Sequence, residues 1–172
     1  MAKAKLRAVT STLAGAIDVG ELGSLRDELQ EWLDSLPESL QGGSKADQLE
    51  EAISSLDSCE EIELPTELEH LENAEVTSIQ NVARKLSRSA RRDNVVSWLR
   101  AAQELLDERA TSYHEYAELE STPSLGTPPD DHNGPWTQDD YTTAAEKALE
   151  LVDEIETICD NVEAAEFPQM YG

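Results

Sequence analysis

Apolar residues recur every three or four positions through much of the chain, which is the spacing of one face of an α-helix. Two such stripes flank a turn at Gly42 and Gly43, and charged residues fill the positions between the apolar ones. The first stripe contains Leu25, Leu29, Trp32, Leu33 and Leu36, and the second contains Ala46, Leu49, Ile53 and Leu56. The pattern predicts a helical hairpin over residues 20–57.

Two further segments show the same spacing. Near the start of the chain, Leu6, Val9, Leu13 and Ile17 share one helical face, which predicts a first helix over residues 1–19. From Val76 to Thr122 the chain contains no Gly or Pro, and apolar residues continue at helical spacing. We therefore expect a long helical region over residues 76–119, with Asp93 and Asn94 as its one plausible division.

The last third of the chain combines a loop and a helix. Residues 121–138 carry four prolines and two glycines, which predicts a long Pro-rich loop. Thr137 is a good N-cap for a C-terminal helix over residues 139–164, and the apolar ending around Phe167 is expected to dock on the domain. Together the segments predict an all-α fold: a single domain over residues 1–172, built as a bundle of five to six helices.

The net charge of the chain narrows the classes of partner. The 172 residues include 37 Asp and Glu against 13 Lys and Arg, a formal charge of −24. Such an excess repels phosphate backbones and anionic lipids, so we expect no direct nucleic-acid binding and no membrane attachment, and we expect a basic protein as partner. Cys59 and Cys159 lie far apart in a sequence without a secretory leader pattern, which favours the cytoplasm.

The positive charges are not spread evenly. Acidic residues dominate residues 18–75 and 115–172, whereas residues 76–100 contain Asp93 as their one acid. The bases of this middle segment are Arg84, Lys85, Arg88, Arg91, Arg92 and Arg100. We expect them to form an internal basic cluster that pairs with the acidic helices of the same chain.

Two interpretations of the acidic helices stay open. Their carboxylates can form solvated faces that keep the protein soluble, as a high-salt host would also select, or they can imitate the phosphates of a nucleic acid. The candidate phosphate mimics, which would bind the partner, are Glu28, Glu31, Asp34, Glu50, Glu51, Glu150, Asp153, Glu154 and Asp160.

The sequence offers little support for catalysis. His70, His114 and His132 belong to no metal-binding motif, and no phosphate-binding loop or nucleophile signature is present, so we expect no metal site, no cofactor and no enzyme. An all-α magnesium-dependent nucleotide pyrophosphatase could use acid pairs one helical turn apart. The available pairs are Glu28 with Glu31, Glu104 with Asp107, and Glu150 with Asp153, but so acidic a composition produces such pairs by chance.

Residues 25–56 and residues 162–172 resemble segments of small acidic proteins encoded by tailed phages and their prophages. The resemblance covers about a quarter of the chain and carries no activity that can be assigned to individual residues. It implies a phage accessory factor in the host cytoplasm that binds host machinery, since acidic phage proteins include nucleic-acid mimics that inhibit DNA-binding proteins. The alternative from the residues alone is a structural or assembly protein that forms homo-oligomers through helical seams.

Overall fold

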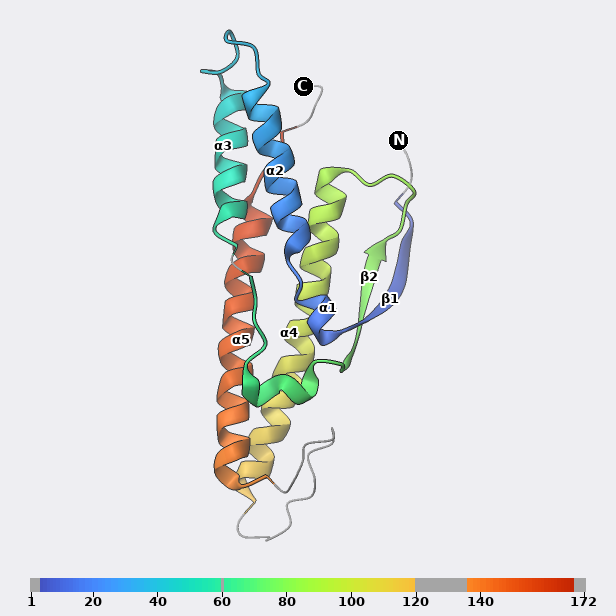
Figure 1. Cartoon of the computed structure of the whole chain (residues 1–172). Coiled ribbons are helices and arrows are strands. Elements are labelled where there is room, and N and C mark those ends of the chain that lie inside the picture. Colours follow the sequence, from blue (N-terminus) through green and yellow to red (C-terminus); the bar gives the residue numbers. More distant parts are fainter. Residues whose placement is uncertain (1–3, 60, 120–135, 169–172) are drawn as a thin grey trace.

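Figure 1 shows a computed structural model of the chain, which describes residues 4–59, 61–119 and 136–168. Two long helices, α4 (Arg88–Glu118) and α5 (Gln138–Ala164), pack along each other. A hairpin of α2 (Gly20–Asp34) and α3 (Ser44–Asp57) packs against one end of this pair. These four helices are called the helical bundle below.

A small antiparallel sheet lies beside α4 (Figure 1). It consists of β1 (Leu6–Thr12) and β2 (Glu75–Asn81), in a register that pairs Leu6 with Asn81 and Thr12 with Glu75. The one-turn helix α1 (Leu13–Ala16) follows β1, and the 3₁₀ helix η1 (Thr66–Leu71) precedes β2. The protein is mostly helical, but the prediction of a purely all-α fold is wrong.

The predicted N-terminal helix is a strand. Leu6, Val9, Leu13 and Ile17 do not share a helical face, because the chain is extended up to Thr12 and only Leu13–Ala16 is helical. Thr12 caps this short helix by accepting a hydrogen bond from the Gly15 N–H at 3.1 Å. The β-branched residues of the strand favour an extended backbone once a partner strand is present.

The start of the predicted long helix is also a strand. In β2 the alternate residues Val76, Ser78 and Gln80 are buried and Thr77 and Ile79 are exposed, which is the two-residue period of a sheet. Two of the buried positions of β2, Ser78 and Gln80, are polar, so the sequence shows no two-residue apolar alternation there. The apolar residues that it does show, Val76 and Ile79, have a helical spacing, which is why the segment was predicted as a helix. The helix itself begins at Arg88, capped by Ser87, and runs without a break through Asp93 and Asn94.

The helical hairpin and the C-terminal helix are confirmed by α2, α3 and α5. Thr137 caps α5 in a capping box, in which its hydroxyl accepts from the Asp140 N–H and the Asp140 carboxylate accepts from the Thr137 N–H. Residues 121–135 of the predicted Pro-rich loop lie outside the described residues. The core of the bundle is formed by fully buried leucines and isoleucines such as Leu29, Leu99 and Ile155.

Candidate functional site

Two arginines of the predicted basic cluster join α4 to α2. The Arg88 Nε lies 3.0 Å from one carboxylate oxygen of Glu28, and a guanidinium nitrogen of Arg91 lies 2.5 Å from the other. Arg91 also pairs with Glu21. The hydrogen bond from Arg91, more than that from Arg88, lowers the pKa of Glu28 below its ordinary value. These charges hold the hairpin against the long helices.

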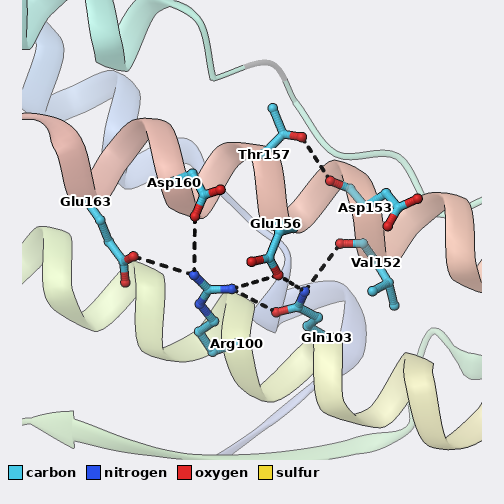
Figure 2. Close-up of polar contacts among 8 residues, drawn as sticks. All are labelled: Arg100, Gln103, Val152, Asp153, Glu156, Thr157, Asp160 and Glu163. Atoms are coloured by element: carbon cyan, nitrogen blue, oxygen red, sulfur yellow. Dashed lines mark hydrogen bonds and ion pairs between the residues drawn. The ribbon is translucent and has the colours of Figure 1, made fainter.

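Arg100 joins α4 to α5 (Figure 2). Its guanidinium lies 2.9 Å from the carboxylate of Glu156, 3.5 Å from that of Glu163 and 3.7 Å from that of Asp160. The side chain of Gln103, one turn along α4, donates a second hydrogen bond to Glu156. The hydrogen bond from Gln103 and the charge of Arg100 lower the pKa of Glu156. The single guanidinium of Arg100 thus forms ion pairs with three carboxylates.

Arg92 holds the end of the chain that follows α5. It pairs with Asp93 at 2.7 Å, donates to the Ala165 carbonyl at 2.8 Å, and places its guanidinium 5.2 Å from the centre of the Phe167 ring. Phe167 packs against the core, so the predicted docking of the apolar ending is observed for this residue. Residues 169–172 lie outside the described part of the chain.

Arg84 and Lys85 behave differently from the rest of the basic cluster. Both are exposed in the connection between β2 and α4, and neither makes an ion pair with another described residue. The cluster therefore divides into four arginines that pair inside the molecule and two cations that face solvent.

The nine candidate phosphate mimics also divide. Glu28 pairs with Arg88 and Arg91, Asp160 with Arg100, and Glu150 with Lys147 at 2.7 Å. The other six are exposed and make no ion pair within residues 4–59, 61–119 and 136–168. They are Glu31 and Asp34 of α2, Glu50 and Glu51 of α3, and Asp153 and Glu154 of α5. These six side chains are called the free carboxylates below.

An acidic groove of about 1170 Å³ opens between α1, the start of α2 and residues 59–72. Its lining includes the apolar residues Ile17, Ile62 and Leu64. Its lining carries the carboxylates of Asp18, Glu61, Glu69 and Glu72 and no Lys or Arg. Sequence reasoning missed this groove, because its walls come from segments that are separated in the sequence and have no shared motif.

His70, at one end of the groove, is part of an aromatic cluster. Its Nε2 lies 2.5 Å from the hydroxyl of Tyr113, the rings of Tyr113 and Trp136 pack against it, and the ring of Tyr141 packs against both of these. These contacts join η1 to the ends of α4 and α5. Aromatic residues are rare in this chain, which could have marked these positions as candidates. The sequence did not show that their side chains contact one another.

The described residues contain no group of three or more His, Cys, Asp or Glu side chains that could hold a metal ion. In two of the three acid pairs weighed for a pyrophosphatase, one member is in an ion pair: Glu28 with arginines and Glu150 with Lys147. Burial raises the pKa of the Cys159 thiol to about 11, so this group stays un-ionised at neutral pH. Within the same residues, no helix has the length and apolar character to cross a membrane.

Comparison with known proteins finds no match: no protein-family model, curated protein or solved structure is similar to this chain.

Proposed function

We propose that this chain is a non-enzymatic accessory protein that binds a basic surface of another protein. One observation carries the proposal: the free carboxylates lie on three helices that pack together, while Arg88, Arg91 and Arg100 pair with other acids of these helices. Thirteen cations cannot neutralise 37 acids, so the external surface keeps most of the negative charge. A surface of this kind attracts a basic partner and accelerates the encounter.

The spacing of charge along α5 supports nucleic-acid mimicry as the form of this binding. Six carboxylates lie between Glu150 and Glu163. At a rise of 1.5 Å per residue they cover about 20 Å of helix axis, with a mean spacing of about 3.9 Å between successive charges. One strand of B-DNA carries one phosphate per about 3.4 Å, so the acids of α5 have a similar spacing along the axis, and the ion pairs of Glu150, Glu156, Asp160 and Glu163 reduce the charge that this helix offers to a basic groove.

Arg100 limits the part of α5 that can act in this way. It pairs with Glu156, Asp160 and Glu163, whereas Asp153 and Glu154 are free of ion pairs among the described residues. The mimicking surface is therefore the half of α5 near Asp153 and Glu154, together with the acidic side chains of α2 and α3. The partner is a nucleic-acid-binding protein of the host cytoplasm, and the binding would inhibit it.

Neutralisation of the free carboxylates tests the proposal. The variant carries Glu31→Gln, Asp34→Asn, Glu50→Gln, Glu51→Gln, Asp153→Asn and Glu154→Gln. A control variant loses the same number of charges at exposed acids outside these three helices: Glu75, Glu104, Asp107, Glu108, Glu115 and Glu118. Both proteins are immobilised and exposed to host lysate at about 50 and 500 mM salt.

The proposal expects wild type and control to retain a basic protein at low salt that the first variant fails to retain. Duplex DNA should compete with the retained partner, and high salt should release it, since screening weakens exposed charge pairs. A partner held equally at both salt concentrations, or no basic partner at all, contradicts the proposal. Concentration-dependent oligomers in sedimentation would favour the assembly hypothesis instead.

A further inference from the structure

The two edges of the small sheet are not equivalent. The outer edge of β2 is covered by α4, whose Asn94 accepts a hydrogen bond from the Asn81 N–H at 2.8 Å and donates one to the Asn81 carbonyl at 3.0 Å. The Ser97 hydroxyl donates to the Ile79 carbonyl at 3.0 Å. Side chains of α4 thus occupy this edge of the sheet at Asn81 and Ile79.

The outer edge of β1 is open. The Val82 N–H donates to the Lys5 carbonyl and the Leu13 N–H donates to the Ala74 carbonyl, each at 2.8 Å, which fixes the phase of the ladder. In an antiparallel pair only alternate residues bond to the partner strand. The main-chain N–H and C=O groups of Leu6, Ala8 and Thr10 therefore point away from β2, and no described segment pairs with them.

The end of the sheet near Lys5 is basic, whereas Glu75 lies at the other end, opposite Thr12. Residues 4–17 and residues 76–92 contain no acid. Lys5, Arg7, Arg84 and Lys85 are exposed and form no ion pair with any described residue, and the contact between Val82 and Lys5 brings the two segments to one end of the sheet. Figure 1 shows that this end lies away from α3 and α5, which carry much of the acidic surface.

The outer face of the sheet carries exposed apolar side chains at the end near Leu6. Leu6 is 66% exposed, and Ile79, which lies opposite Ala8 in the register, is 56% exposed. An added strand next to β1 would place alternate side chains beside these residues and the others beside Arg7. The edge therefore fits a strand in which apolar and acidic residues alternate.

We propose that the outer edge of β1 binds an extended acidic segment of a partner protein as a third strand of the sheet. Main-chain hydrogen bonds from Leu6, Ala8 and Thr10 supply affinity, and Lys5, Arg7, Arg84 and Lys85 select acidic side chains. This surface is separate from the free carboxylates, so the inference does not depend on the function proposed above.

Two other occupants fit the edge less well. A nucleic-acid phosphate accepts hydrogen bonds only, and the exposed carbonyls of Leu6, Ala8 and Thr10 would repel it. A second copy of the chain would pair β1 with β1, which contains no acid to meet Lys5 and Arg7. An acidic peptide satisfies both the alternating donors and acceptors and the positive charge.

The direct test uses a seven-residue synthetic peptide, Thr-Glu-Val-Glu-Val-Glu-Thr, added to the full chain labelled with ¹⁵N. At saturation the amide exchange of Ala8 and Thr10 should slow at least tenfold, because these N–H groups become hydrogen-bonded. The amides of Arg7 and Val9, already bonded to β2, should change little. The same peptide with Lys in place of Glu should bind at least tenfold more weakly.

A pair of proline variants tests the main-chain contacts. Ala8→Pro removes an N–H that points away from β2, so the β1–β2 ladder stays intact while the added strand loses a donor. Ala4→Pro, outside β1, is the matched control. We expect Ala8→Pro to weaken peptide binding at least tenfold and Ala4→Pro to leave it unchanged. Because Ala8→Pro could still disturb the sheet, the exchange measurement on the wild-type chain decides independently.

Several outcomes overturn the inference. Absence of binding at millimolar peptide does so, as does binding without protection of Ala8 and Thr10, or equal binding of the Lys peptide. Equal binding of a single-stranded oligonucleotide assigns the surface to nucleic acid, and protection that grows with protein concentration alone assigns it to a second copy. A chain with its six free carboxylates neutralised should still bind the peptide, which separates this result from the test of the proposed function.

Discussion

The helical bundle and the small sheet differ in whether their charged side chains form ion pairs. In the bundle, acidic helices are held together by a few arginines that each contact more than one carboxylate, as Arg91 and Arg100 do. In and beside the sheet, the exposed cations Lys5, Arg7, Arg84 and Lys85 form no ion pair with a described residue. Although the chain has a net charge of −24, one end of its sheet is basic. The net charge of the whole chain therefore does not show how charge is distributed between the bundle and the sheet.

The two regions also differ in how they are stabilised. The bundle buries long apolar side chains between helices, whereas β1 is exposed or half-buried at every position. A two-stranded sheet is marginal by itself, so this one depends on its packing against α4. The following predictions test that dependence and the separation of charge.

The largest expected effect comes from the core of the bundle. Leu106→Ala removes a fully buried side chain of α4 and should lower the free energy of unfolding by about 3 kcal/mol. Ile79→Ala, on the exposed face of the sheet, should cost less than about 1 kcal/mol. Urea unfolding followed by circular dichroism measures both. Equal losses would show that the sheet contributes to stability as much as the bundle.

The contact between the sheet and α4 comes next. Asn94→Ala leaves the N–H and C=O of Asn81 without their partner and should cost about 1–2 kcal/mol. Hydrogen exchange should increase in β2 before it increases in α4, because the loss is local. Asp93→Ala, at an exposed neighbouring position, is the control and should leave exchange in β2 unchanged.

The internal ion pairs should have a smaller effect. Arg91→Met removes the contacts with Glu21 and Glu28 and should lower the free energy of unfolding by about 1 kcal/mol, since the groups are partly solvated. Arg84→Met removes one charge from a side chain without an observed ion pair and should change stability by less than about 0.5 kcal/mol. Thermal and urea unfolding of the two variants would contradict this division if both lost equal stability.

The smallest effect concerns pH. The pKa of Glu28 is lowered in the folded chain, so its contribution to stability is present at neutral pH and is lost as the pH falls through that lowered pKa. Glu28→Gln should therefore be less stable than wild type at pH 7, and the gap should narrow below about pH 4.5. Urea unfolding from pH 7 to pH 3 measures the gap; a difference that is constant over this range would exclude the linkage.

The sequence predicted the helices whose apolar stripe is long and uninterrupted. The stripes in residues 25–36 and 46–56 appear as α2 and α3, and Thr137 caps α5 as expected. In β1 and β2 the prediction was wrong, because Leu6 and Val9, like Val76 and Ile79, are three residues apart, which suits a helix, while two of the buried alternate positions of β2 hold the polar Ser78 and Gln80. The two strands are more than sixty residues apart, so the pairing that decides between these states is not visible in either segment.

The candidate site was predictable in composition and not in arrangement. The division of the chain into acidic and basic segments was evident in the sequence. Of the six cations of residues 76–100 that were expected to pair internally, Arg88, Arg91, Arg92 and Arg100 form ion pairs, whereas Arg84 and Lys85 form none with a described residue. That Glu28 and Asp160 are used inside while Glu31 and Asp153 stay free depends on which helix faces meet. The groove near His70 and the open edge of β1 had no signal of their own in the sequence.

By itself, then, the sequence determined the properties that add up residue by residue: the net charge, the helical character of the long amphipathic segments and the location of the basic residues. Tertiary structure decided which carboxylates find a cation, which segments pair as strands and which edge of the sheet stays open. These properties depend on contacts between distant residues, and the energy of a charge or of a main-chain hydrogen bond is set by the partner it meets.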